Sequence, residues 1–433
     1  DGMGMNQVNG TEMFLAECEG RIGTEALSFS GFPVRDFITT YSAYNAITCS
    51  SAAGTALACG VKTRNGIVGL DSLGQKSVAS IAERAQGLGI PVGIITSVGM
   101  NHATPAAFYS HQKSRNMYFE IGQDAVERGF DLYGGARVLG AVSEDGSTNL
   151  YDSFEQAGYV VARGMDAFEQ AISEASKLLV VQDSEADALP YAIDRKPGDM
   201  TLPGMTRGAI DFLMKKNKGF FLMAEGGEID FASHSNDGAT VLREVVDFAE
   251  AVRVAYDFYL QHPDETLIVV TADHETGGLV LGNGSSDLNL KLLTNQKMSL
   301  SALSGEMRRL RKAAGGKEVA WNDLKELLTE SLGFWNAVSL TAEEEKALSD
   351  CYEETFSGKS FDMVKTLYSE DEPLAVLAVG ILNTKARVSW ASDGHSATPV
   401  PVYAIGVGAD LFSGRLDNTD IPKIISDVAG YGL

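Results

Sequence analysis

The chain has 433 residues, of which 44% are hydrophobic and 21% charged, a composition typical of a globular protein with a large core. Its 35 basic and 58 acidic residues give a formal net charge of -23. Because phosphate backbones are held mainly by Lys and Arg, this balance argues against a nucleic-acid-binding surface or an anionic membrane as partner. No apolar run is long enough to form a transmembrane segment.

The first notable stretch is ITCSSAAGTALACGVKT, residues 47–63, in which Ser50 and Ser51 precede a run of small residues. This composition predicts a helix that packs closely against a sheet. The free N–H groups and positive dipole end of such a helix stabilise an alkoxide and bind phosphate. The residues alone leave two interpretations open, because a serine here can be a nucleophile or can simply cap the helix.

Four short apolar runs follow along the chain, separated by segments of helical period. They are PVGIITS (91–97), GFFLMAE (219–225), TLIVVTA (266–272) and PVYAIG (401–406). This alternation predicts an α/β fold with a largely parallel central sheet flanked by helices on both faces. Residues 283–375 carry charged amphipathic helices without strand-like runs, one of them opened by a Thr341/Glu344 capping box. We expect a single catalytic domain, 1–433, with residues 283–375 as a helical insertion within it.

Metal-binding side chains gather around these runs. His102 and Thr104 follow the first run, Glu225, Asp230 and His234 end or follow the second, Asp273 and His274 follow the third, and His395 precedes the fourth. Ligands of open parallel sheets bind at the carboxyl ends of strands, and carboxylate oxygen combined with imidazole nitrogen suits zinc. One Asp/His pair alone is usually a solvated loop or a capped helix end. Its recurrence at successive strand ends predicts a metal site.

Together these motifs resemble the alkaline phosphatase family. The matching segments are DGMG (1–4), SAAGTALACGVKTRNG (51–66), HATPAAFYSHQKSRNMY (102–118), EGGEIDFASH (225–234), TADHETGGL (271–279) and GHSATPVPVYAIG (394–406). The resemblance runs from the first residue to about residue 410, except across the insertion. It implies an enzyme that hydrolyses small-molecule phosphate monoesters with broad specificity through a phosphoserine. It also implies a periplasmic or otherwise exported protein, and we expect the precursor to extend upstream of Asp1.

The resemblance further implies a three-metal site with two Zn²⁺ and one Mg²⁺. Its register places Ser50, not Ser51, at the nucleophile and leaves Ser51 as a helix cap, while Arg115 falls at the arginine that clamps phosphate. The implied ligands are Asp230, His234 and His395 for the first zinc, Asp1, Asp273, His274 and the Ser50 oxygen for the second, and Asp1, Thr104 and Glu225 for magnesium.

Three positions depart from the family pattern. Cys49 stands where many members carry an Asp that orients the arginine, and His102 stands where members vary between Asp and His, which leaves magnesium or zinc open for the third site. Phe231 occupies a position often filled by Lys or His. We treat His102 and Phe231 as substrate-binding positions, and expect phosphate to leave more readily where a phenyl ring replaces a cation, unless Phe231 instead packs beside the following helix.

Two other function classes remain as alternatives at this point. One is a phosphodiesterase or sulfatase of the same superfamily, although the sulfatase signature Cys-x-Pro-x-Arg is absent around Cys49. The other is a non-catalytic relative that binds metal or an anion. The sequence leaves open whether the protein is a monomer or a homodimer.

Overall fold

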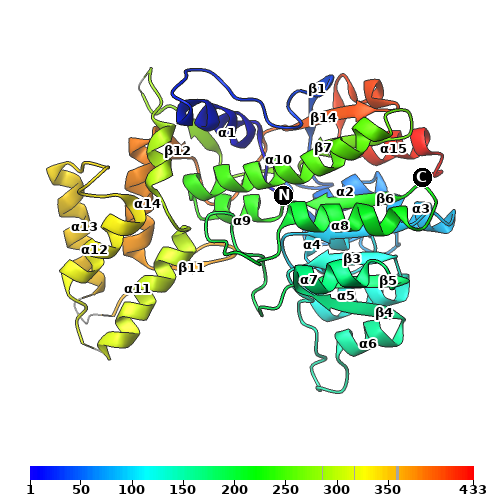
Figure 1. The fold of residues 1–433 in the computed structure, drawn as a ribbon, viewed down its shortest axis with the longest axis horizontal. Helices are drawn as coiled ribbons and strands as arrows, with labels where there is room; N and C mark the ends of the chain where they lie inside the picture. Colours follow the sequence, from blue (N-terminus) through cyan, green and yellow to red (C-terminus); the bar gives the residue numbers. More distant parts are fainter. Residues whose placement is uncertain (285, 316, 357–359) are drawn as a thin grey trace.

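The computed structural model describes residues 1–284, 286–315, 317–356 and 360–433. A five-stranded sheet, in which every pair of neighbours is parallel, lies in one half of the molecule (Figure 1). In spatial order its strands are β4 (Tyr159–Arg163), β5 (Lys177–Val181), β3 (Leu132–Gly135), β2 (Val92–Thr96) and β6 (Phe221–Glu225). The predicted α/β fold with a parallel sheet is confirmed, and β2 and β6 correspond to the first two apolar runs.

The last two apolar runs form a second sheet, where they pair antiparallel. Its order is β15 (Leu416–Asp417), β1 (Val34–Thr39), β14 (Val400–Gly406) and β7 (Leu267–Thr271). The prediction of parallel neighbours was wrong for β7 and β14, because Val402 faces Thr271 in an antiparallel register. The amino end of β14 therefore lies beside the carboxyl end of β7. This pairing explains why His395 precedes its strand although Asp273 and His274 follow theirs.

Helices and short elements complete the fold. The helices are α1 (Met5–Cys18), α2 (Ser50–Cys59), α3 (Ile81–Gly87), α4 (Ala103–Ala106), α5 (Tyr118–Arg128), α6 (Leu150–Gln156), α7 (Gly164–Ala171), α8 (Leu202–Met214), α9 (Glu228–His234), α10 (Gly238–Gln261), α11 (Leu300–Ala314), α12 (Trp321–Leu332), α13 (Ala342–Thr355), α14 (Pro373–Lys385) and α15 (Asp420–Ala429), with 3-10 turns η1 (Leu290–Asn295) and η2 (Ala409–Phe412). The short strands are β8 (Glu275–Thr276), β9 (Leu279–Leu281), β10 (Val364–Lys365), β11 (Glu370–Asp371), β12 (Val388–Trp390) and β13 (His395–Ser396). Among the described residues, no helix combines the length and apolar character needed to cross a membrane.

Helices cover both faces of the parallel sheet because successive side chains of a strand point in opposite directions. Ile94 of β2 belongs to a buried cluster with Ala82 of α3 and Ile121 of α5. Its neighbour Ile95 belongs to a different cluster, which contains Phe212 of α8. The long helix α10 packs against α8, α9 and β7, and so links the two sheets.

The helices α11 to α14 pack together to one side of both sheets, at the left of Figure 1. The predicted capping box at Thr341 and Glu344 is present at the start of α13. We propose that residues 283–375 are an insertion within one catalytic domain, because their hydrophobic cluster also takes in Phe14 of α1 and Leu242 of α10. Leu382 of α14 belongs to this cluster as well, so the helical unit continues past residue 375.

Candidate active site

Ser50 is the first residue of α2 and is fully buried. Its Oγ lies 3.3 Å from His274 Nε2 and accepts a hydrogen bond from Arg115 Nη1 at 3.4 Å. The hydroxyl of Ser51 lies 3.2 Å from Cys49 Sγ instead. The prediction that Ser51 caps the helix was wrong, because the N-cap residue is Cys49 and no side chain caps this end. Only Ser50 therefore presents its hydroxyl to the histidine and the arginine.

One cluster of ligand groups surrounds His274. Its Nε2 atom lies 3.3 Å from Asp1 Oδ1 and 3.1 Å from Asp273 Oδ2. The other ring nitrogen, Nδ1, lies 3.2 Å from Thr276 Oγ1. Burial lowers the pKa of His274 to about 3, so its imidazole is neutral and has a lone pair available for a metal ion.

A second cluster joins α9 to the segment before β14. Asp230 and His234 are one helical turn apart, with His234 Nε2 3.4 Å from Asp230 Oδ2. His395 Nε2 lies 3.2 Å from His234 Nε2 and 3.9 Å from Asp230 Oδ1. Burial alone would raise the pKa of Asp230, but its bond to His234 and the nearby imidazoles hold that pKa below the usual range. An ionised carboxylate and two imidazoles here form a donor set suited to zinc.

The two clusters share Asp230. Ligand atoms of Asp230, His234 and His395 lie within 4.8 Å of one another, and so do those of Asp1, Asp230 and His274. Asp230 was assigned to the first zinc alone, so its closeness to Asp1 is a feature that the sequence motifs did not indicate. It places the two ligand groups side by side around one carboxylate.

The residues assigned to magnesium also lie in this part of the site. Thr104 Oγ1 donates to Asp1 Oδ2 at 3.2 Å, and Thr96 Oγ1 donates to Glu225 Oε2. Several buried carboxylate oxygens in the described part of the chain have no hydrogen-bond partner, and four of them belong to the assigned ligands: Asp1 Oδ1, Glu225 Oε1, Asp230 Oδ2 and Asp273 Oδ2. Three of these four lie 3.1–3.4 Å from an imidazole Nε2, and only Glu225 Oε1 does not. Unpaired buried carboxylate oxygens are costly without a cation, so this donor set fits bound metal ions.

Arg115 contacts Ser50 through Nη1 and, through Nη2, contacts Tyr368, a residue that the sequence analysis did not single out. Its Nη2 atom donates to Tyr368 Oη at 3.0 Å and lies 3.4 Å from His102 Nε2. The ring of Phe231 stacks on Tyr368, with centroids 3.9 Å apart, and meets the edge of His102 at 5.6 Å. Phe231 thus packs within an aromatic group next to Arg115, and its effect on phosphate stays a prediction.

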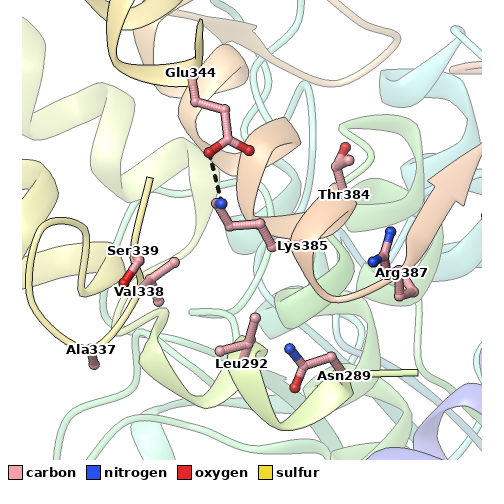
Figure 2. Close-up of a pocket in the computed structure, with 9 residues that line it drawn as sticks. All are labelled: Asn289, Leu292, Ala337, Val338, Ser339, Glu344, Thr384, Lys385 and Arg387. Carbon is pink, nitrogen blue, oxygen red and sulfur yellow. Dashed lines mark ion pairs between the residues drawn. The ribbon is translucent and has the colours of Figure 1, made fainter. Parts of the chain in front are cut away.

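Sequence reasoning missed Tyr368. It lies between β10 and β11, in the segment treated as an insertion, and 253 positions separate it from Arg115. No motif surrounds it that a reader of the sequence could connect to phosphate chemistry. A separate pocket in the same helical region is bridged by an ion pair between Glu344 and Lys385, and shares no residue with the site (Figure 2).

Comparison with known proteins agrees with this geometry. The sequence model of the family described as alkaline phosphatase matches residues 1–142 and 135–431. Alkaline phosphatase 4 of Bacillus subtilis is 33% identical over 397 residues, which cover 90% of this chain and 78% of that protein. The crystal structure of a cold-active alkaline phosphatase from Shewanella sp. is 29% identical, with a TM-score of 0.81 and coverage of 99% of this chain and 97% of that one. The Thermus thermophilus alkaline phosphatase is 27% identical, with a TM-score of 0.81 and coverage of 100% and 90%.

The chain belongs to the alkaline phosphatase family. It is a metal-binding hydrolase with alkaline phosphatase activity, which releases phosphate from phosphomonoesters. This finding favours the leading interpretation of the sequence over the phosphodiesterase, sulfatase and non-catalytic alternatives.

Proposed function

We propose that this phosphatase works through a covalent phosphoserine on Ser50. The observation that carries the proposal is the position of Ser50 Oγ, 3.3 Å from His274 Nε2 and 3.4 Å from Arg115 Nη1, at the start of α2. The Oγ–P bond forms as the bond from phosphorus to the leaving alcohol breaks. Water then cleaves the Oγ–P bond, which releases inorganic phosphate and restores the serine.

We further propose the ligands of two Zn²⁺ and one Mg²⁺. The sets are Asp230, His234 and His395 for one zinc, Asp1, Asp273, His274 and Ser50 for the other, and Asp1, Thr104 and Glu225 for magnesium. Their support is the convergence of imidazole nitrogens with buried carboxylate oxygens. When bound, such cations lower the pKa of a hydroxyl or water and stabilise a leaving oxygen.

The remaining residues bind and orient the phosphate group. The fork of the Arg115 guanidinium can hold two phosphate oxygens beside Ser50, while the N–H groups at the start of α2 face the same anion. Fixed donors of this kind stabilise the charge on phosphate in the transition state. Small phosphate monoesters of varied leaving group are the substrates that we propose, in an exported location, and a homodimer remains a further proposal.

The serine assignment is tested by acid-quench trapping of labelled phosphate. Ser50→Ala should abolish both turnover of p-nitrophenyl phosphate and the trapped label, whereas Ser51→Ala should retain much of both. Label kept in the Ser50 variant and lost in the Ser51 variant would shift the nucleophile by one residue. Bis-p-nitrophenyl phosphate and p-nitrophenyl sulfate, assayed with the wild type, measure the preference for monoesters.

A further inference from the structure

We propose that Tyr368 is a positioning residue for Arg115, and that it holds the guanidinium in the orientation that grips phosphate. This inference rests on the proposed role of Arg115 as the phosphate clamp. It concerns a residue from the helical insertion region, outside the strand-end motifs that carry the other site residues.

The first observation is that Arg115 is held by neutral groups. Among the described residues no carboxylate lies within ion-pair distance of its guanidinium, and its partners are Ser50 Oγ, His102 Nε2 and Tyr368 Oη. The contact with Tyr368 is the shortest of the three, at 3.0 Å. Cys49, which precedes Ser50, instead accepts a hydrogen bond from the Gly66 N–H at 3.1 Å. The phenol is therefore the principal fixed acceptor for Nη2.

The second observation is that the Tyr368 ring is itself tightly located. Phe231 stacks on it at 3.9 Å with planes 20° apart, and His102 and His234 meet it edge-on at 5.6 and 5.3 Å. Aromatic pairs at these separations contribute to packing and fix ring orientation. The hydroxyl of Tyr368 consequently points in one direction, toward Nη2 of Arg115.

The backbone beneath Tyr368 is anchored on both sides. The N–H of Thr366 donates to the carbonyl of Ser369 at 2.9 Å, which closes a turn around Tyr368. Ser369 Oγ lies 3.2 Å from Ser235 Oγ at the end of α9, and Arg308 of α11 donates to the carbonyl of Glu370 at 2.8 Å. The insertion region thus places a rigid hydrogen-bond acceptor, the Tyr368 hydroxyl, beside Arg115.

When Tyr368 fixes Nη2 of Arg115, Nη1 is directed at Ser50 Oγ, 3.4 Å away. Ser50 Oγ is the atom to which phosphorus bonds in the proposed reaction. Without the phenol oxygen, the long arginine side chain would regain rotamers that it must lose again when phosphate binds. Loss of this contact should weaken substrate and product alike. The expected effect is about three- to tenfold in affinity, the size of one ordinary hydrogen bond.

The test uses the metal-loaded enzyme and Tyr368→Phe, which keeps the stacked ring and removes only the hydroxyl. The KM for p-nitrophenyl phosphate and the inhibition constant for inorganic phosphate should rise together by about three- to tenfold, while kcat changes less than KM. Melting temperature and metal content should match the wild type. Leu367→Ala is the matched control, since this neighbour on the same turn is 59% exposed and should leave both constants unchanged.

A double-mutant cycle then separates positioning from mere packing. If Tyr368 acts through Arg115, the inhibition constant of Arg115→Ala should not rise further when Tyr368→Phe is added. Two outcomes would overturn the positioning role but leave the phosphate clamp standing. In the first, the effects of the two substitutions on the inhibition constant multiply in the double variant. In the second, Tyr368→Phe keeps the wild-type inhibition constant while Arg115→Ala raises it. A wild-type constant in Arg115→Ala would contradict the proposed phosphate clamp, and this inference with it.

Discussion

Each of the three imidazoles proposed as zinc ligands, His234, His274 and His395, has a hydrogen-bond partner at its Nδ1 atom. His395 Nδ1 lies 2.9 Å from the carbonyl of Thr48, and His234 Nδ1 bonds to the carbonyl of Asp393. These bonds set the ring direction and direct Nε2 into the site, as partners of metal-binding histidines do. Because 347 positions separate Thr48 from His395, the orientation depends on tertiary contacts and not on the local motif.

A buried carboxyl group on α10 links protonation to stability. Glu244 of α10 is buried, and its pKa is raised from 4.5 to about 8, mainly by burial. The charge of Arg195 and the hydrogen bond from the Ala192 N–H oppose this rise, whereas the negative charges of Asp247 and Asp194 add to it. Since the pKa is higher in the folded state, the folded protein keeps a proton that the unfolded chain loses. This group therefore stabilises the fold fully below about pH 4.5, and that contribution is lost as pH rises toward 8.

Glu244→Gln should remove this pH dependence. The glutamine oxygen can still accept the Ala192 N–H, yet the side chain cannot ionise. Relative to wild type, the variant should gain stability between about pH 5 and pH 8, by up to about 1.4 kcal/mol per pH unit. Urea unfolding of the metal-saturated proteins measures this difference. Glu250→Gln, on an exposed part of the same helix, is the control, and parallel pH curves for Glu244→Gln and wild type would contradict the raised pKa.

At the level of elements, α2 and α4 carry Ser50 and Thr104 and lie against each other. We expected α2 to pack on the sheet through its small residues, but its main neighbours are α4 and α15. A Cβ added at Gly54 would lie 3.1 Å from the Ala107 Cβ and 3.4 Å from the Thr104 Cα. The missing side chain at Gly54 therefore permits the distance at which the two helices pack.

Gly54→Val should force α2 and α4 apart. We expect a loss of about 1–3 kcal/mol in the free energy of unfolding, typical of overpacking a filled interior. Phosphatase activity should fall as well, because Thr104 would move relative to Ser50. Gly380→Val, on α14 with no heavy atom within 4 Å of the added Cβ, should be close to neutral. Equal stabilities for the two variants in urea unfolding would show that the close approach at Gly54 does not matter.

The whole molecule has a formal net charge of -23, and four of its acidic residues are buried close together in the site. Without cations, their repulsion and desolvation oppose folding, and a ligand that binds only the folded state stabilises it by mass action. Chelation should therefore lower the melting temperature by about several degrees, and zinc with magnesium should restore it. Asp230→Asn, which removes the shared carboxylate charge, should respond less. An unchanged melting curve, with no metal found before chelation, would contradict the three-metal proposal.

Local patterns in the sequence were sufficient to predict several strands, the motif residues of the site and one helix start. Strands β2, β6, β7 and β14 coincide with the four apolar runs. A buried strand such as β2 or β14 needs apolar side chains on both faces, and β6 and β7, at the ends of their sheets, are apolar although only partly buried. The motif residues around Asp230, His274 and Ser50 could be predicted because each lies within a few positions of a strand or helix end. The capping box of α13 is local in the same sense.

The sequence alone predicted four of the strands, the α/β class, the family and a set of candidate ligands at strand ends, because these depend on residues close together along the chain. It did not indicate β1, β3, β4 or β5, which the structure adds to the two sheets. Only the tertiary structure decided that β7 and β14 run antiparallel, that Asp230 lies beside Asp1, and that Tyr368 contacts Arg115. Each of these depends on contacts between segments more than a hundred positions apart. Such contacts are selected by the packing of the entire core, and no local pattern of residues records them.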